Sequence, residues 1–592
     1  MSARYAVGLD IGDGESSLAW IAMGESEEQP RLFSLNPGET SVVTAIALKR
    51  GGKGDEYVIG EAALREPDSH MVQLNFKTRP VLTPGRTPPP MPAVEFARLF
   101  WREFEKRHPD IANGCAIFVG CPAGWKEEAS FYEKKLAEAL EPHPVTVVPE
   151  SQSAFIYVVD VARIDPQKAH PVLVVDVGSS TTDFTLVDKE PGSPEFGEPH
   201  NLPFGDQLGC KDIDKAMRKL VISSLEDQDP SAAQRLGNPW EGSLLLWLCR
   251  RRKEAAYGHP AAKEPSPSGI LNWVLQTCSD RLATIDVEGL VNREWRPRLL
   301  NEVVAVHEYL GTRQPQLVLT TGGGSRMPFV GEICREVFGL PEESVNPVPD
   351  PSHAVARGLA CYGRWRDRVD RFGKKAGDLA DSDDIERIVR ADADRFARRF
   401  YNIFYSNIFK AVLLPIADEI ERGANYRDLM EHSALYSRIV KWIDSPDGSA
   451  AREELVGPLE QAIEKKLSPK TEELCKEFGL KTDALQIKIH LPPERWYDAY
   501  AARSIRKYQY VIRKYQYIRS PVGRATLRMF APVNSVISSS LAPVLAVIQK
   551  LTEDDIEEII RRVQDSVREQ LLKRVGELER LLARPWQAST GK

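Results

Sequence analysis

Two short turns of small residues each follow an aspartate, and this combination is suited to binding phosphate. In YAVGLDIGDGESSLAWIAM, Asp10 precedes the turn 12–14 between two alternating hydrophobic runs, which predicts a β-hairpin. In PVLVVDVGSSTTDFTLVD, Asp176 precedes the turn 178–181 in the same way. Small residues let backbone N–H groups cradle phosphate oxygens, and a carboxylate at a strand end can hold a hydrated magnesium ion. Two such hairpins facing each other would clamp a polyphosphate.

A single glycine-rich turn is usually no more than a tight turn, but its recurrence after an aspartate favours binding. A third segment, QLVLTTGGGSRMPFVGEICREVFG, reads as a strand, a triple glycine and a helix. Its backbone can lie close to a flat ring or a phosphate at the helix N-terminus. The candidate contacts from the three segments are Gly12, Asp13, Gly14, Gly178, Ser179, Ser180, Gly322, Gly323, Gly324, Ser325 and Arg326.

The elements that would position these turns change in character along the chain. Because 592 residues exceed a single core, two or more domains are expected. Up to about Arg364, strand-like runs such as 172–177 alternate with helical patterns such as 94–106, which predicts an α/β domain. The stretch 227–239 reads as a surface loop. We therefore expect an α/β domain at 1–368 and a mainly helical domain at 383–592, where only 485–491 alternates like a strand.

Composition and charge exclude several classes of protein. A formal charge of -7 with 28% charged residues gives no overall attraction to nucleic acid, which makes such a partner unlikely. The N-terminal residues run directly into a strand-like segment rather than a secretory signal, so a cytoplasmic protein is expected. The eight cysteines lie far apart with no CxxC pair, and we expect them to be reduced and mostly buried.

The order of these motifs resembles the actin-like ATPase superfamily and, in detail, the nucleotide-binding domain of DnaK-type (heat-shock 70) chaperones. GLDIGDGES and VVDVGSSTTD resemble its two phosphate loops, TTGGGSRMP its adenosine loop and DPSHAVARGLA its closing helix. The resemblance spans about Arg4 to Arg364. It implies an actin-like ATPase fold, in which two lobes of duplicated ribonuclease-H-like topology surround a nucleotide cleft.

The resemblance also implies roles for single residues, with ATP or ADP and Mg²⁺ as cofactors. LNFKTRP, after YVIGEAALREP, places the catalytic lysine at Lys77, and VVPESQSAFIY places at Glu150 the glutamate that orders the magnesium shell and the attacking water. FGDQLGCKDID resembles the glycine-rich start of the fourth subdomain. Asp10 and Asp176 would hold magnesium through water. In the remaining roles Lys77 neutralises the γ-phosphate, Thr181 contacts the transferring phosphoryl group, and Lys253 matches an adenosine-side lysine.

Three departures from the family pattern concern the cleft. Asp13 and Glu15 replace a threonine pair, and two carboxylates near a triphosphate repel it unless they turn outward or face the metal. Arg250 stands where a glutamate is usual, and Ser352 replaces an acidic residue in the closing motif. The rate of hydrolysis and the choice of base are therefore open.

The C-terminal part lacks the acidic-and-leucine linker and the run of strands that follow the ATPase domain in this family. It carries instead a repeat of IRKYQY in a stretch that has no acidic residue between Asp498 and Glu553. This basic stretch, 503–550, could bind an anionic membrane surface, which would make the protein peripheral to a membrane, or an acidic partner; the simpler reading is a helical bundle with a solvated basic side. The final helical pattern, 553–582, has an apolar stripe that could pack within the domain or on a second copy.

Three functions fit the sequence. The first is an ATP-driven, chaperone-like switch in which closure of the cleft controls how the helical C-terminal domain binds an unidentified protein partner or client. The alternative is an actin-like ATPase that forms filaments. A small-molecule kinase of the same fold is disfavoured by Lys77 and its motif.

Overall fold

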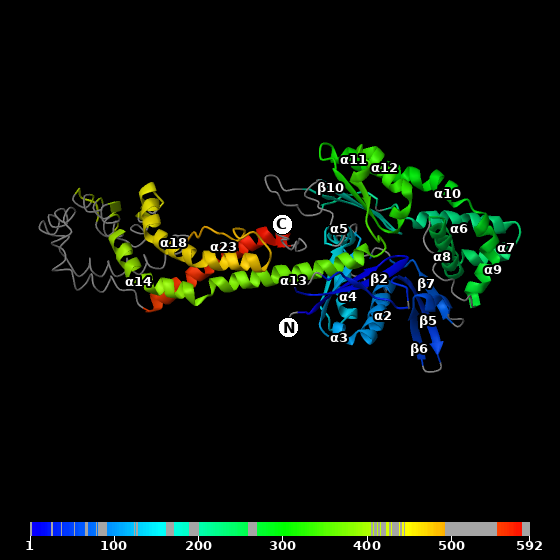
Figure 1. Cartoon of the computed structure of the whole chain (residues 1–592), viewed down its shortest axis with the longest axis horizontal. Coiled ribbons are helices and arrows are strands. Elements are labelled where there is room, and N and C mark those ends of the chain that lie inside the picture. The colour runs from blue at the N-terminus through cyan, green and yellow to red at the C-terminus, as the bar shows by residue number, and fades with distance from the viewer. Residues whose placement is uncertain are drawn as a thin grey trace, which may run out of the picture. The chain divides into compact units, whose positions relative to one another are not determined.

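The structure is a computed structural model of the whole chain. It describes residues 3–24, 28–36, 38–51, 54–65, 69–77, 80, 91–122, 125, 128–160, 171–188, 200–205, 207–257, 269–403, scattered positions within 407–442, then 444–491 and 553–582. These residues divide into an N-terminal unit that runs to Arg368 and a C-terminal unit that runs from Val369 to Glu579. Sheets with covering helices in the first unit make it an α/β structure, and helices dominate the second (Figure 1).

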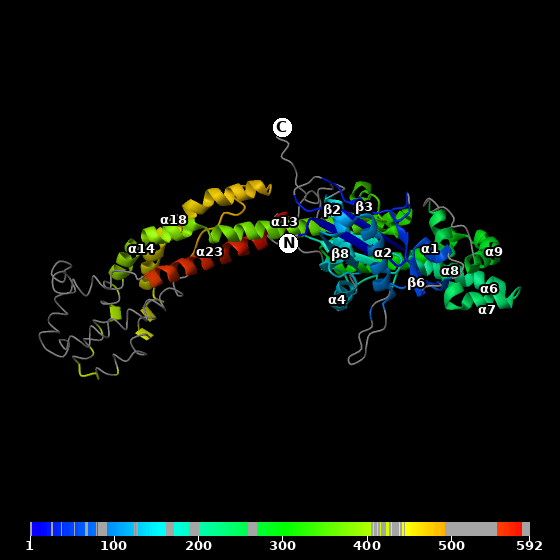
Figure 2. The same ribbon diagram turned by 90° about the horizontal axis from the view of Figure 1, so that it is seen from below.

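The first sheet of the N-terminal unit has the strand order β3-β2-β1-β8-β9. Antiparallel pairing joins β1 to β2, and parallel pairing joins β1 to β8 and β8 to β9. Helix α2 (Pro92–Arg107) covers one face through Phe96, Phe100 and Phe104, and α4 (Ala129–Ala139) adds Tyr132 and Leu136 to the same core (Figure 2). The strands are β1 (Tyr5–Ile11), β2 (Glu15–Ala22), β3 (Arg31–Leu32), β8 (Cys115–Cys121) and β9 (Val145–Pro149), with β4 (Val42–Val43) also paired to β2.

The second sheet repeats this plan with the order β12-β11-β10-β13-β14. Its central hairpin is again antiparallel, and the two strands on the other side are again parallel. Every residue of β10 and β11 is buried, because helices cover both faces of the sheet. The strands are β10 (Val172–Val177), β11 (Thr182–Val187), β12 (His200–Asn201), β13 (Leu317–Thr321) and β14 (Val345–Pro347).

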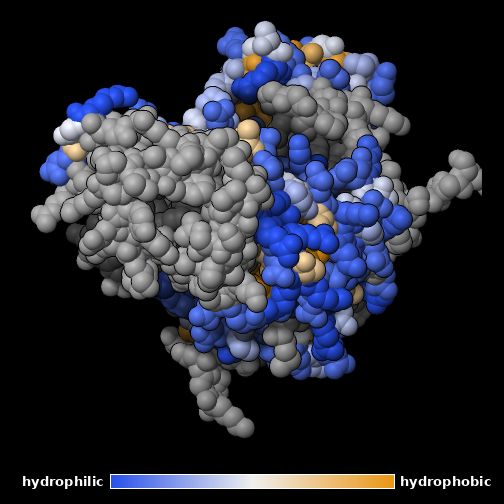
Figure 3. Space-filling model, turned by 90° about the vertical axis from the view of Figure 1, so that its left-hand side faces the viewer, coloured by the Kyte–Doolittle hydropathy of each residue, from blue (hydrophilic) through white to orange (hydrophobic). Residues whose placement is uncertain are grey.

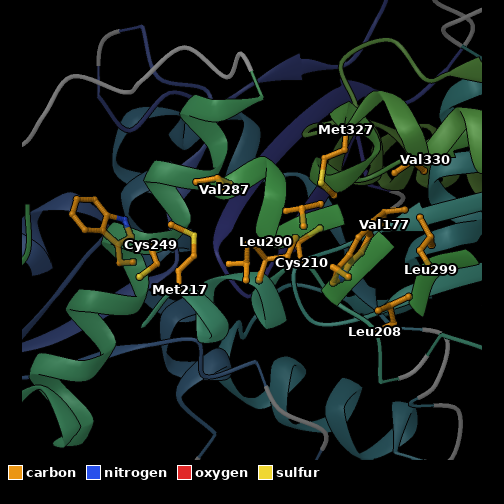
Figure 4. Packing of buried hydrophobic residues seen from close by; sticks show 14 of the residues in the cluster. Val177, Leu208, Cys210, Met217, Cys249, Val287, Leu290, Leu299, Met327 and Val330 are labelled. Atoms are coloured by element: carbon orange, nitrogen blue, oxygen red, sulfur yellow. The ribbon is translucent and has the colours of Figure 1, made fainter. Parts of the chain in front are cut away.

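A large apolar core lies between the second sheet and its helices (Figure 4). Val177 at the end of β10 and Val330 on α12 belong to the same cluster as Met217 on α6 and Cys249 on α8. Burying such side chains contributes about 25 cal/mol for each Å² of apolar surface removed from water. The helices are α6 (Lys211–Glu226), α8 (Pro239–Ala256), α9 (Gly269–Thr284), α11 (Arg296–Leu310) and α12 (Pro328–Phe338).

The stretch 227–239, predicted to be a loop, instead contains helix α7 (Pro230–Gly237). Asp229 caps it by accepting a hydrogen bond from the Ala232 backbone N–H at 3.0 Å, and Pro230 occupies the first turn. Aspartate followed by proline is a strong helix-start signal that the prediction missed because it weighed both residues as helix breakers.

Helix α5 (Glu150–Asp160) and the first part of α13 (Ala354–Ala380), which continues past Arg368 into the C-terminal unit, need glycines to pack closely in the N-terminal unit. A Cβ at Gly8 of β1 would lie 2.1 Å from the Ala356 carbonyl oxygen of α13. A Cβ at Gly358 would lie 1.8 Å from the Ser153 carbonyl oxygen of α5. A third, smaller sheet has the order β6-β5-β7, with β5 (Ala45–Gly51), β6 (Gly54–Ile59) and β7 (Ser69–Leu74); α1 (Glu61–Arg65) follows β6.

The C-terminal unit is built from long helices. Ion pairs connect them: Arg390 of α14 pairs with Glu557 of α23, and Lys470 of α18 pairs with Asp384 of α14 at 2.5 Å. Most of the predicted apolar stripe of the last helix is buried where its side chains are described, at Ile559, Ile560, Val563, Val567, Leu571 and Val575, whereas Ile556 is partly buried. The helices are α14 (Asp383–Ile403), α18 (Pro446–Glu477) and α23 (Glu553–Leu582).

The basic stretch 503–550 and its IRKYQY repeat lie outside the described residues. Among the helices that are described, none has the length and apolar character needed to cross a membrane. On the face seen in Figure 3, the described surface is mainly hydrophilic, with small hydrophobic patches between hydrophilic residues. All eight cysteines are described, and all are buried and free, as predicted.

Candidate functional site

One cleft in the N-terminal unit is lined by both aspartate-headed hairpins. Asp10 lies near the end of β1, opposite Ser17 of β2, and Asp176 lies near the end of β10, opposite Asp183 of β11. The sheets hold these carboxylates in place because the strands that carry them are buried along almost their whole length. The structure thus brings Asp10 and Asp176 to one site, together with Gly12, Asp13, Gly14, Gly178, Ser179, Ser180 and Thr181.

The triple-glycine turn forms another wall of this cleft. Gly322 has a φ of 79°, and a Cβ there would lie 2.3 Å from Asp176 Oδ1. A Cβ at Gly324 would lie 2.5 Å from Cys210 Sγ. The backbone of the turn therefore packs directly against these side chains, and only glycine permits so close an approach. Gly322, Gly323, Gly324 and Arg326 line the cleft, whereas Ser325 is buried and donates its hydroxyl to the Gly322 carbonyl at 2.7 Å.

Lys77 and Glu150, which lie far apart in the sequence, form an ion pair inside the cleft. Glu150 is the first residue of α5, and Lys77 follows β7 by a few residues. Only 5% of the lysine side chain is exposed. Burial alone would lower the pKa of Lys77, but the carboxylates of Glu150 and Asp10 outweigh it and raise the pKa above its usual value. Lys77 therefore stays charged at the pH of a cell.

The carboxylates of the cleft are crowded. Burial, together with the negative charge of Glu150, raises the pKa of Asp10 to about 7, although Lys77 and His353 oppose the shift. Burial, Glu150, Asp183 and Asp10 likewise raise the pKa of Asp176 well above its usual value. Like charges brought together in a partly dry site favour a cation between them. Within the part of the chain that the structure describes, no three His, Cys, Asp or Glu side chains are arranged to hold a metal ion directly.

The two acidic residues of the first turn neither point outward nor stay unpaired. Asp13 Oδ2 accepts from Lys211 Nζ of α6 at 2.8 Å, and its Oδ1 is buried without a hydrogen bond. Glu15 Oε1 pairs with Arg250 NH2 of α8 at 3.2 Å, and Glu15 Oε2 accepts from Ser41 Oγ at 3.0 Å. Each carboxylate of the turn is thus matched by a basic side chain from a helix of the other half of the unit.

Sequence reasoning did not assign Lys211 or Arg250 to the site. Arg250 was visible as a departure from the family pattern, and Lys211 follows Cys210 in FGDQLGCKDID. Neither position indicates by itself which carboxylate it will meet, because the partners are more than 190 residues away. Arg250 also donates to Glu254 Oε1 at 2.6 Å and lies over Gly14, where a Cβ would come within 1.7 Å of its NH1.

The other predicted contacts also carry internal partners. Lys253 lines the cleft, but its Nζ donates to the Cys210 carbonyl at 3.0 Å and to Asp214 Oδ2 at 2.9 Å. Arg326 donates from NH2 to Ser352 Oγ at 3.0 Å, and its Nε is buried without a partner. Thr181 donates its hydroxyl to Asp183 Oδ2 at 2.9 Å. These side chains are held in position by hydrogen bonds within the site.

The chain has detectable sequence similarity to known chaperones. The chain is 23% identical over 386 residues to the chaperone protein DnaK of Ureaplasma parvum serovar 3. It is 22% identical over 405 residues to the mitochondrial-type heat shock protein 70 of Encephalitozoon cuniculi, and 22% identical over 395 residues to DnaK of Metamycoplasma hominis. The chain is distantly similar to the heat-shock 70 chaperones.

The similarity to heat-shock 70 chaperones is partial on both sides. It covers 61%, 60% and 61% of this chain and 58%, 62% and 59% of the three relatives, so the chain spans less than two thirds of their length. No protein-family model matches the chain. The similarity is therefore distant and covers only part of the chain, so it does not establish the activity of the whole protein.

Proposed function

We propose that the N-terminal unit is a magnesium-dependent ATPase of actin-like fold, and that its cleft binds ATP and ADP. The observation that carries this proposal is the shared cleft of the two hairpins, each headed by an aspartate at the end of a central strand. The common strand pattern of the two sheets supports a duplicated, two-lobed origin. Distant similarity to heat-shock 70 chaperones supports the same choice of ligand.

The phosphates would lie between the turns 12–14 and 178–181, whose residues line the cleft. Backbone N–H groups of such turns can cradle phosphate oxygens. The nucleoside would lie against the turn 322–326 and the end of α8, near Lys253. Lys77 would stabilise charge on the γ-phosphate, since it is buried and permanently cationic. Glu150, which holds Lys77, would orient the attacking water, and the Thr181 hydroxyl would contact the transferred phosphoryl group.

The carboxylates fit a hydrated magnesium ion. Asp10 and Asp176 supply the oxygen donors that Mg²⁺ prefers. Their pKa values are raised first by burial and then by neighbouring carboxylates, and a bound cation would oppose both effects. Because no direct protein cage exists in the described residues, we assign coordination through water, as is usual for this ion. Magnesium bound with the nucleotide would neutralise charge on the phosphates. Asp10 and Asp176 would orient its water shell.

We further propose that the protein acts as a chaperone or switch whose partner is another protein. Nucleotide-dependent closure of the cleft would control how the C-terminal unit binds that partner or client. The support is the similarity to proteins named as chaperones and the presence of a second, helical unit. We also propose a cytoplasmic location.

Titration of the full chain with a fluorescent ADP analogue, with and without magnesium, tests the nucleotide proposal. We expect binding that magnesium strengthens at least tenfold. The Lys77→Ala variant should bind within a few-fold of wild type but hydrolyse ATP about 100-fold more slowly, because the lysine acts mainly on developing charge. Absence of adenine-nucleotide binding by the folded wild-type protein would refute the proposal, and unchanged turnover in Lys77→Ala would refute the role of the lysine.

A further inference from the structure

In the C-terminal unit, residues 484 and 485 end a turn, and the chain then runs to Leu491 without helix or strand, with a regular pattern of burial from Leu485 onward. Leu485 and Leu491 are completely buried and Ile489 is 2% exposed, whereas Gln486, Lys488 and His490 face solvent. The predicted alternation is therefore present as a pattern of burial, but the segment 484–491 is not a β-strand. Within the described residues, it pairs with no strand. Figure 1 shows it as the orange coil that follows α18.

Carboxylates of α18 bond the backbone of this segment on one side. The Ile489 backbone N–H donates to Glu464 Oε1 at 2.7 Å, and the Leu491 N–H donates to Glu460 Oε1 at 2.7 Å. The acceptors are four residues apart, so they project from the same face of the helix one turn from each other. They match the N–H groups of alternate residues, which point to the same side of an extended chain.

Helix α23 bonds the segment on its other side. Gln570 takes both backbone groups of one residue: its Oε1 accepts from the His490 N–H and its Nε2 donates to the His490 carbonyl, each at 2.9 Å. Arg574 Nε donates to the Ala484 carbonyl at 2.9 Å. A side-chain amide that pairs with both groups of one residue reproduces the bonds of a neighbouring antiparallel strand. The segment is thus held between two helices as if it lay in a sheet.

These bonds have a consequence for recognition. Glu464, Gln570 and Arg574 contact only the main chain of the segment in the bonds described, whereas Glu460 also lies 3.8 Å from Nδ1 of the His490 side chain. Every residue except proline offers the same main-chain groups. Selectivity then comes from the apolar side chains at every second position. Main-chain bonds for affinity and alternate side-chain pockets for specificity are the features by which proteins bind extended peptides.

We propose that α18 and α23 form a peptide-binding groove, which residues 484–491 occupy as an internal ligand. The external ligand would be an extended segment of another polypeptide with apolar residues at alternate positions. This inference rests on the proposed function in one respect, that the partner is a protein. The internal segment shows which sequence fits: apolar residues alternate with polar ones from Leu485 to Leu491. The apolar residues are buried except for Ile487, which is partly buried.

A labelled peptide with the sequence of residues 484–491 tests the proposal on the full chain. Ile489→Glu should expel the internal segment, because it would bury a charge, and so raise affinity for the peptide at least about tenfold over wild type. Adding Gln570→Ala should reduce that affinity about tenfold, since the paired amide is lost. Adding Gln564→Ala instead, on the same helix, is the matched control and should leave affinity unchanged.

Three outcomes overturn the proposal: no gain of peptide binding in a folded Ile489→Glu protein, no loss on adding Gln570→Ala, or equal binding of a peptide with glutamate at its three buried positions. Hydrogen exchange of the wild-type chain covers the case in which Ile489→Glu does not fold. An exchangeable internal ligand requires the amides of Ile489 and Leu491 to exchange at least about tenfold faster than those in the middle of α18. Equal protection would make the segment permanent core and overturn the groove.

Binding of the fluorescent ADP analogue to the same samples separates the two proposals. If folded wild-type protein does not bind the ADP analogue, the nucleotide function is refuted, and the peptide-binding result still tests the groove. If the folded Ile489→Glu protein binds the ADP analogue but no peptide, the groove is refuted and the proposed nucleotide site is not.

Discussion

The two hairpins of the cleft share a backbone plan but are fixed in place by different forces. The first turn carries Asp13 and Glu15, and ion pairs with Lys211 and Arg250 tie it to helices of the other half of the unit. The second turn carries no charge between Gly178 and Thr181. Its carbonyls instead accept from the backbone at the start of α6: Gly178 from Cys210 N–H at 3.1 Å and Ser179 from Lys211 N–H at 2.8 Å.

This difference separates two ways of fixing a hairpin at the edge of the cleft, where we propose that phosphate binds. The second turn depends on close backbone approach, since a Cβ at Gly209 would lie 2.2 Å from the Ser179 carbonyl oxygen. The first depends on charge balance, since Asp13 and Glu15 would repel a triphosphate if their basic partners were removed. We therefore expect the second hairpin to be sensitive to side-chain volume and the first to ionic strength and pH.

The largest effect is expected where volume matters most. Gly322→Ala places a methyl group against Asp176 Oδ1 at a positive φ, and it should cost about 2–4 kcal/mol of stability. It should also weaken nucleotide binding strongly, because the carboxylate must move. Chemical denaturation and nucleotide titration measure the two effects. Gly323→Ala meets no atom within 4 Å and should change stability by less than about 0.5 kcal/mol; similar losses in both variants would contradict the packing argument.

An intermediate effect is expected from the carboxylate of the first hairpin. The pKa of Asp10 is about 7 in the folded protein, against an ordinary value of 3.8, so the folded state binds the proton more tightly. Without nucleotide and magnesium, its contribution to stability is present at low pH and is lost as pH rises toward 7. Asp10→Asn should remove this loss and be more stable than wild type by about 1–3 kcal/mol at pH 8, after allowance for solvent screening in the open cleft.

The difference between Asp10→Asn and wild type should shrink as pH is lowered from 8 to 5, which denaturation at each pH can follow. Asp176→Asn should behave in the same direction, since the pKa of Asp176 is also raised. If only one of the two variants shows the pH dependence, the hairpins are not electrostatic equivalents. A pH-independent difference in both would contradict the crowding of carboxylates.

The smallest effect is expected from the Arg250–Glu15 ion pair. A double-mutant cycle with Arg250→Met and Glu15→Gln should give a coupling energy of about 1 kcal/mol at low salt, because the pair is only partly exposed. The coupling should fall by about half or more at 0.5 M salt, where charges are screened beyond a few ångströms. Ser180→Ala in the second turn provides the comparison and should show no such salt dependence. A coupling energy that does not change with salt concentration would mean that Arg250 and Glu15 interact through packing and not through charge.

The sequence predicted the residues that line this cleft better than the ion pairs among them. Asp10, Asp176 and the glycines of the third turn could be predicted because the recurrence of a turn after a buried strand is a local pattern. Lys211 and Arg250 could not be assigned, since their partners depend on how α6 and α8 pack against the distant first sheet. Similarly, the alternation of 485–491 predicted its burial, but not that glutamates and a glutamine would replace a neighbouring strand. The periodicity of a sequence predicts which residues are buried, but it does not predict which distant polar groups pair with each other.

The burial of every cysteine has a practical consequence for labelling. Burial raises the pKa of Cys115, Cys121 and Cys334 to about 12, and the pKa of Cys210 and Cys278 to about 11, so these thiols carry little thiolate at neutral pH. Maleimide dyes react with the thiolate. A single exposed cysteine introduced on either unit would therefore outcompete the native ones, and donor and acceptor fluorophores could be attached without first constructing a cysteine-free background.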